Sequence, residues 1–228
     1  VQPARLERSG RGTGHVRGAA VSTRGEALTY KIASVLLQYP DDHVLGSLPD
    51  TCAALPLIPH KAARRSVGEF VGWLRARSHA EAAEHYVSTF DLRRRCCLYL
   101  SYYRHGDTRA RGMALLAMKQ AYRAAGHQPP DNELPDYLPL LLEFAAMEPD
   151  AGRELLVRCQ PGLELLRQGL AETSSPYRHL IDAVCAGLPT PGRQQRATIA
   201  KLRSDGPPGE QVGLEPFAPP EYITGEAR

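Results

Sequence analysis

The sequence has little of what marks a β protein, a membrane protein or a secreted protein. Only 7% of its 228 residues are aromatic, and β-branched runs are scarce, which argues against an all-β fold. The longest apolar stretch, from 138 to 146, contains Pro139 and Glu143 and is far shorter than the ~20 residues of a membrane span. No apolar segment follows the N-terminal arginines. We therefore predict neither a signal peptide nor membrane insertion, and a cytoplasmic location.

Motifs for metal binding and for the commonest catalytic chemistry are also absent. The five cysteines are odd in number and lack framework spacing, so we expect reduced thiols rather than a disulfide scaffold. Neither the cysteines nor the eight histidines form a C-x-x-C or H-E-x-x-H pattern, and we predict no metal site. There is no Gly-Lys dipeptide of a phosphate-binding loop and no G-x-S-x-G nucleophile motif. The sequence thus indicates no catalytic residues.

Charge and composition divide the chain into three parts. Residues 1–25 carry five arginines against one glutamate and little apolar content, so we expect a disordered basic leader. Residues 204–228 carry five prolines, four glycines and a net charge of −4, and we expect a loosely structured acidic tail. Between them, residues 26–203 form one nearly neutral body, so net charge does not indicate a partner.

Within this body, apolar residues recur at helical spacing. The stripe at Val67, Phe70, Val71 and Leu74 is typical, and the stripe that starts at Ala110 ends at Gly126, a C′ glycine. We predict a single all-α domain, a packed bundle of about eight to ten helices without a convincing strand. The expected helical stretches are 28–39, 42–55, 67–74, 80–89, 98–103, 110–121, 136–147, 152–170, 177–188 and 192–203.

An arginine-rich stretch leaves several alternatives open. Arg93 to Arg95 together with Arg104, Arg109 and Arg111 could form a basic patch for nucleic acid, although nearby acidic residues are available to pair with them. A weak site for an anionic ligand is a more plausible use of the same arginines. Cys96, which follows three arginines, could be a reactive thiol, but no base lies near it in the sequence.

The segment 133–144 is the most distinctive. Pro135 and Pro139 flank Asp136 at the start of an apolar helix, where proline is tolerated and a carboxylate complements the helix dipole. This pattern is compatible with a merely stiff helix start. It is equally compatible with an acidic ledge beside an apolar groove, a surface suited to a basic amphipathic peptide.

Five segments of the chain form an ordered set of short motifs: Tyr39-Pro40-Asp41, YVSTFD at 86–91, LYL at 98–100, HGDTRARG at 105–112 and ELPDYLPLLLEF at 133–144. In this order they resemble the nitrate reductase delta subunit family of assembly chaperones, the NarJ type within the wider TorD-like family. The resemblance covers roughly residues 28–190. Tyr137 replaces a histidine common in that family's motif.

The resemblance implies a cytoplasmic helical chaperone without enzymatic activity. Such a protein binds the immature catalytic (alpha) subunit of respiratory nitrate reductase, at its N-terminal segment, and permits insertion of the molybdenum cofactor before membrane assembly. It implies no stably bound cofactor, since the molybdenum cofactor of the client is handled indirectly. We expect no nucleic acid as partner, and a monomer or homodimer.

The resemblance and the acidic ledge together give a set of candidate residues. The residues expected to set the internal geometry are Tyr86, Phe90, Gly106, Arg109 and Gly112. The residues expected to bind the client peptide are Asp91, Leu134, Pro135, Asp136, Tyr137, Leu138 and Glu143.

Three other functions remain as alternatives to a nitrate reductase chaperone. They are a chaperone of another molybdoenzyme, a helical nucleic-acid binder and a small enzyme or cofactor carrier.

Overall fold

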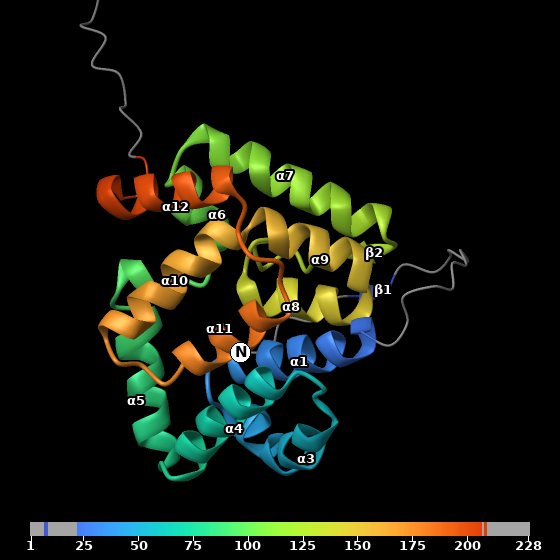
Figure 1. Cartoon of the computed structure of the whole chain (residues 1–228), viewed down its shortest axis with the longest axis vertical. Helices are drawn as coiled ribbons and strands as arrows, with labels where there is room; N and C mark the ends of the chain where they lie inside the picture. Colours follow the sequence, from blue (N-terminus) through green and yellow to red (C-terminus); the bar gives the residue numbers. More distant parts are fainter. Residues whose placement is uncertain (1–6, 9–21, 207, 209–228) are drawn as a thin grey trace, which may run out of the picture.

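The computed structural model describes residues 7–8, 22–206 and 208, and this part of the chain is almost entirely helical (Figure 1). Most of the expected leader and tail lies outside these residues, so the three-part division stays a prediction. The described elements, in chain order, are β1 (Glu7–Arg8), α1 (Ser22–Leu36), α2 (Asp42–Gly46), α3 (Leu48–Ala54), η1 (Leu55–Leu57), α4 (Lys61–Arg75), α5 (His79–Phe90), η2 (Arg94–Cys96), α6 (Leu100–His105), α7 (Arg109–Ala124), β2 (His127–Gln128), α8 (Leu138–Met147), α9 (Pro149–Arg158), α10 (Gln160–Glu172), α11 (Arg178–Ala186) and α12 (Arg193–Asp205).

The all-α class is confirmed, but the described residues contain twelve α-helices and two 3₁₀ helices rather than eight to ten. Prolines account for the difference. Pro49 lies in the first turn of α3, and Pro161 in the first turn of α10, so each starts a new helix where a longer one was expected. The two-residue strands β1 and β2 form one antiparallel pair, with Glu7 opposite Gln128.

Helix α8 lies at the centre of the bundle. Seven of its ten residues are buried, and a helix that is apolar on all sides belongs in a core. It packs side by side with α1 and against α9 (Figure 1). The contact with α9 is very close because a Cβ on Gly152 would collide with the backbone of Ala145. This position therefore requires glycine.

A second part of the core is an aromatic cluster around Tyr177, the N-cap residue of α11. Its ring contacts those of Phe70 and Trp73 on α4 and those of His85, Tyr86 and Phe90 on α5, with centroids 4.8 to 6.0 Å apart. Tyr86 and Phe90 are buried, and the role expected of them in the internal geometry stays a prediction. The cluster fastens α4, α5 and α11 together.

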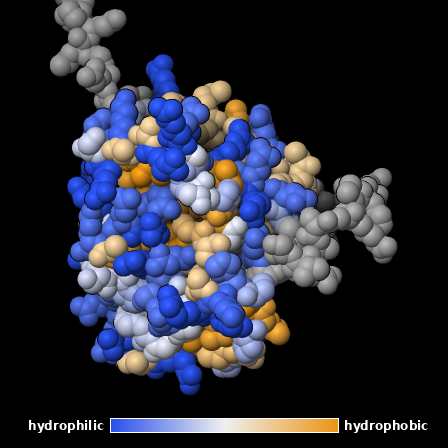
Figure 2. Space-filling view, viewed as in Figure 1, coloured by the Kyte–Doolittle hydropathy of each residue, from blue (hydrophilic) through white to orange (hydrophobic). Residues whose placement is uncertain are grey.

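The exterior is largely polar. Figure 2 shows hydrophilic side chains over most of one face, with apolar side chains gathered in small patches. Helix α12 has no buried residue and packs on α10. Within the described residues, no helix is both long and apolar enough to cross a membrane.

Candidate functional site

Two of the sequence motifs, 98–100 and 133–144, lie side by side. The amide of Leu138 donates to the carbonyl of Leu98 at 2.9 Å, and the amide of Leu100 donates to the carbonyl of Asp136 at 3.1 Å. These bonds form an isolated antiparallel bridge between Tyr99 and Tyr137. The segment from 98 to 103 was expected to be helical throughout, but helix α6 begins only at Leu100, and Tyr99 before it is extended. The bridge gives the backbone groups of this segment hydrogen-bond partners that a helix would otherwise supply.

Asp136 points into the protein, beneath this bridge. Its side chain has 0% exposure to solvent, and its Oδ2 accepts hydrogen bonds from the amide and the hydroxyl of Ser101, at 3.0 and 2.6 Å. Its Oδ1 has no partner among the described residues. The expected acidic ledge is therefore wrong at Asp136, because the carboxylate caps the buried start of α6 instead of facing solvent.

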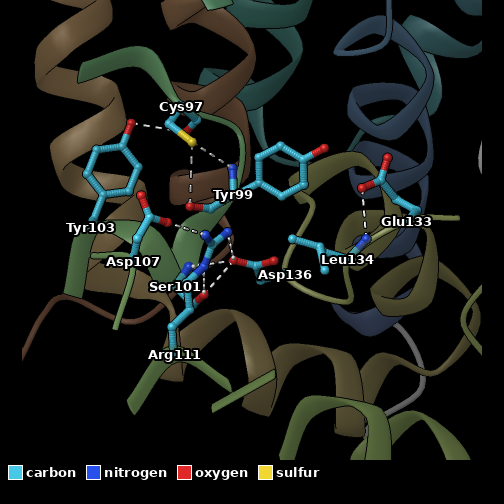
Figure 3. Close-up of polar contacts among 9 residues, drawn as sticks. All are labelled: Cys97, Tyr99, Ser101, Tyr103, Asp107, Arg111, Glu133, Leu134 and Asp136. Carbon is cyan, nitrogen blue, oxygen red and sulfur yellow. Dashed lines mark hydrogen bonds and ion pairs between the residues drawn. The ribbon is translucent and has the colours of Figure 1, made fainter. Parts of the chain in front are cut away.

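Arg111 connects Asp136 to the surface. Its guanidinium lies 3.8 Å from Oδ2 of Asp136 and 2.9 Å from Oδ1 of Asp107, and it also donates to the Ser101 hydroxyl at 3.3 Å. Figure 3 shows these side chains directed toward one another. The sequence placed Arg111 in a possible basic patch with acidic residues nearby to pair with it, but did not connect it to Asp136. Its helical spacing of four residues from Asp107 was a visible signal for the pair.

The two glycines of the motif 105–112 have different surroundings. Gly106 has a φ of +55°, and a Cβ there would collide with the backbone of Pro208, so only glycine fits. A Cβ on Gly112 would meet nothing within 4 Å. Arg109 is exposed at the start of α7. Position 106 thus requires glycine, and the internal role expected of Arg109 and Gly112 stays a prediction.

A partly exposed group of tyrosines lies next to the buried network of Asp136, Ser101 and Arg111. The rings of Tyr99 and Tyr137 are 5.3 Å apart, and the ring of Tyr39 contacts that of Tyr86 at 5.5 Å. Burial raises the pKa of Tyr137 to about 12, against a smaller lowering by the Tyr86 hydroxyl. We call this group, with the neighbouring residues described next, the tyrosine surface: Tyr39, Asp91, Tyr99, Glu133, Leu134 and Tyr137.

Two carboxylates border the tyrosine surface. The charges of Glu133 and Asp91 further raise the pKa of Tyr137, and burial, followed by Glu133, raises the pKa of Tyr99. Asp91 is exposed at the end of α5, and Leu134 is 38% exposed. The amide of Leu134 donates to the Glu133 carboxylate at 2.8 Å (Figure 3). The surface thus combines apolar rings with negative charge.

The remaining candidate residues do not lie on this surface. Pro135 and Leu138 are buried. Glu143, on α8, pairs with Lys31 of α1 at 2.7 Å, and only 13% of its side chain is exposed. Of the seven candidates for peptide binding, the structure brings Asp91, Leu134 and Tyr137 together at the surface.

One cavity was not anticipated from the sequence. It has a volume of about 560 Å³ and lies between η2, α6, α10 and α12. Asp107 and Gly106 line it, whereas none of the seven candidates for peptide binding does. The Asp107–Arg111–Asp136 network therefore runs from this cavity to the underside of the tyrosine surface. Such a cavity has no local pattern, because helices far apart in the chain enclose it.

The described residues show no group of three or more His, Cys, Asp or Glu side chains that could hold a metal ion. Burial raises the pKa of the Cys96 thiol, and this effect exceeds the opposing effect of Arg93. The alternative of a reactive thiolate at Cys96 is therefore not supported, since a buried thiol is a poor nucleophile.

The sequence of this chain is similar to those of known proteins. A sequence profile described as "Nitrate reductase delta subunit" matches residues 60–182. The chain is 34% identical over 169 residues to the probable nitrate reductase molybdenum cofactor assembly chaperone NarJ of Bacillus subtilis, covering 74% of this chain and 92% of that protein. It is 34% identical over 155 residues to the Escherichia coli K12 chaperone NarJ, covering 66% of this chain and 65% of the relative.

A further relative is longer. The nitrate reductase-like protein NarX of Mycobacterium tuberculosis is 42% identical over 159 residues, or 69% of this chain. That match covers 24% of NarX. The chain therefore spans about a quarter of that relative's length.

Proposed function

Because the chain belongs to the nitrate reductase delta subunit family, we propose that it is a chaperone for the immature catalytic subunit of a respiratory nitrate reductase. In this role it permits molybdenum cofactor insertion in the cytoplasm before membrane assembly, handles the cofactor only indirectly and catalyses no reaction. The observation that carries the proposal is the match to the Bacillus subtilis chaperone, which covers 92% of that protein.

We assign client binding to the tyrosine surface. Tyr39 is 47% exposed, and with Leu134 and Tyr137 it offers apolar contact, while Asp91 and Glu133 supply negative charge. These properties suit a basic amphipathic segment, whose apolar side would cover the rings and whose cations would face the carboxylates. The N-terminal segment of the catalytic subunit is the proposed occupant.

The buried candidates have a positioning role in this assignment. Asp136 is hydrogen-bonded to Ser101 and neighbours Tyr137 in the chain, so it fixes the loop that presents the tyrosine ring. Pro135 and Leu138 anchor the same loop in the core, and Glu143 holds α8 to α1 through Lys31. A fixed loop binds more tightly because less conformational entropy is lost on association.

Affinity purification from the native host, grown on nitrate without oxygen, tests the function. We expect mass spectrometry to identify the catalytic subunit of nitrate reductase in its cofactor-free form. Recovery of another molybdoenzyme would show that this enzyme, and not nitrate reductase, is the client. Recovery of nucleic acid would refute the chaperone assignment. Neighbouring genes should encode nitrate reductase subunits.

Calorimetry with a synthetic N-terminal peptide of the catalytic subunit tests the placement of the site. A chaperone must release its client, so we expect a dissociation constant between about 50 nM and about 1 μM. The double variant Asp91→Asn with Glu133→Gln should weaken binding about fivefold, because exposed ion pairs contribute little individually. Glu154→Gln, an exposed acidic position on α9, is the matched control. Equal weakening by the control would refute the assignment to the tyrosine surface.

A further inference from the structure

A second cavity, of about 190 Å³, lies where α6 and α7 meet the junction of α9 and α10. Arg104 and His105 of α6 and Arg158 of α9 are its basic lining residues, and no acidic residue lines it. The client-binding assignment above does not involve this cavity. Its apolar lining consists of Leu100, Ala114, Ala117, Met118, Leu155 and Pro161.

Among the described residues, the two lining arginines have no carboxylate partner, unlike several other arginines of the bundle. Arg95, Arg153 and Arg167 each form an ion pair with a carboxylate, at 2.6 to 3.1 Å. Within the part of the chain that the structure describes, neither Arg104 nor Arg158 has such a pair. Both arginines are exposed to solvent and line the same cavity, so an anion bound there would face two cations without a competing carboxylate.

The charges of both arginines reach the interior of the cavity. Burial raises the pKa of Cys159, another lining residue, to about 12; the Asp136 carboxylate raises it further, while Arg158 and Arg104 both lower it. Burial and Arg104 lower the pKa of His105. Asp136 does not line the cavity, and Arg111 and Ser101 compensate its charge. The open space is therefore bordered by positive charge.

The size of the cavity limits the ligand. At about 190 Å³ it is smaller than the roughly 300 to 1,000 Å³ of pockets for drug-sized molecules. Guanidinium groups bind carboxylates through charge-assisted hydrogen bonds in matching geometry. We propose that this cavity binds a small organic anion, a carboxylate on a short apolar stem. The carboxylate lies between Arg104 and Arg158, and the stem lies against Ala114 and Met118.

Calorimetric titration of the full chain with hexanoate tests the proposal. For a ligand of this size we expect a dissociation constant of about 1 mM. Arg104→Gln and Arg158→Gln should each weaken binding about threefold to fivefold, because each removes one cation at an exposed position. Arg196→Gln, at an exposed arginine of α12 that lines neither cavity, should leave binding unchanged.

Two further measurements separate an anion site from a merely apolar one. Hexylammonium, which has the same stem and the opposite charge, should not bind. Ala114→Phe fills the apolar part, keeps both arginines and should abolish hexanoate binding, with circular dichroism confirming that the fold is retained. Absence of hexanoate binding at about ten times the expected constant would overturn the proposal. Equal binding of hexylammonium, or unchanged hexanoate binding in both arginine variants, would also overturn it.

Discussion

The guanidinium of Arg111 lies 3.8 Å from a carboxylate oxygen of Asp136 that is fully buried. This arginine is itself only 17% exposed, and it is the cationic partner of that carboxylate among the described residues. The pair joins α7 to the loop that precedes α8. The stability of the loop therefore depends on a residue 25 positions earlier in the chain.

Replacing Arg111 should be costly because it leaves a buried carboxylate without a cation. We expect Arg111→Met to lower the free energy of unfolding by about 2 to 4 kcal/mol, measured by urea denaturation. Adding Asp136→Asn to this variant should recover part of the loss, because the uncompensated charge is removed. Arg123→Met, at an exposed position on α7, should change stability by less than about 0.5 kcal/mol. Equal effects at 111 and 123 would contradict the pairing.

Gly106 and Gly112 form a matched pair for a test of backbone requirements. Gly106→Ala should destabilise the protein by at least about 1 to 2 kcal/mol, because its φ is +55° and its Cβ would strike Pro208. Gly112→Ala should stabilise it by up to about 1 kcal/mol, since alanine favours a helix and the space there is open. Thermal unfolding of both variants shows whether each substitution raises or lowers the stability of the protein. A stabilising effect at 106 would show that the left-handed conformation is not required.

Leu134 and Leu138 separate surface from core within one motif. Leu134→Ala should weaken binding of the client peptide while stability stays nearly constant, because Leu134 is 38% exposed. Leu138→Ala should cost about 2 to 5 kcal/mol of stability, since Leu138 is fully buried. Calorimetry and chemical denaturation, applied to both variants, give the comparison. The assignment of the surface fails if Leu134→Ala binds the peptide as well as the parent chain.

The elevated pKa of Tyr137 makes stability depend on alkaline pH. The folded state holds this hydroxyl neutral, with a pKa of about 12 against 10.0 for a free tyrosine. Its contribution is complete below pH 10.0 and is lost as pH rises toward about 12, because the unfolded chain ionises first. Urea denaturation across this range should therefore show a smaller loss for Tyr137→Phe than for the parent chain. An equal loss in both would contradict the elevated pKa.

The pKa of His85 is shifted in the opposite direction, and it makes the stability of the protein depend on acidic pH. Burial, with the cations of Arg77 and Arg93, lowers its pKa below the usual 6.5. A histidine held neutral stabilises the folded state above the unfolded pKa, and that contribution is lost as pH falls through the folded pKa. Nuclear magnetic resonance titration should place the His85 midpoint below 6.5, and Arg77→Gln should raise it. A midpoint at the usual value would exclude the effect of burial.

Helices with strong apolar periodicity could be predicted from the sequence. The stripe from Val67 to Leu74 lies in α4, and the stripe from Ala110 lies in α7, which is followed by Gly126 with a φ of +82°. Divisions between helices were harder to predict because proline is compatible with both a first turn and a break. The stretch 152–170 therefore divides into α9 and α10.

The candidate site was only partly predictable, for a physical reason. Local patterns identified Asp136 and Tyr137 as distinctive, and the motif at 98–100 was equally visible. Their pairing is set by tertiary contact, and so is the burial of Asp136 against Ser101. A carboxylate at a helix start usually faces water, so its inward orientation had no signal in the sequence.

The aromatic cluster around Tyr177 has an optical consequence. Trp73 is the single tryptophan of the 228 residues, and its ring lies 5.0 Å from that of His85 and 6.0 Å from that of Tyr177. Indole fluorescence of the whole chain therefore originates at one place. Tyr177 and Tyr86 connect that place to Tyr39 at the surface, so we expect the emission of the unlabelled protein to change when the tyrosine surface is occupied.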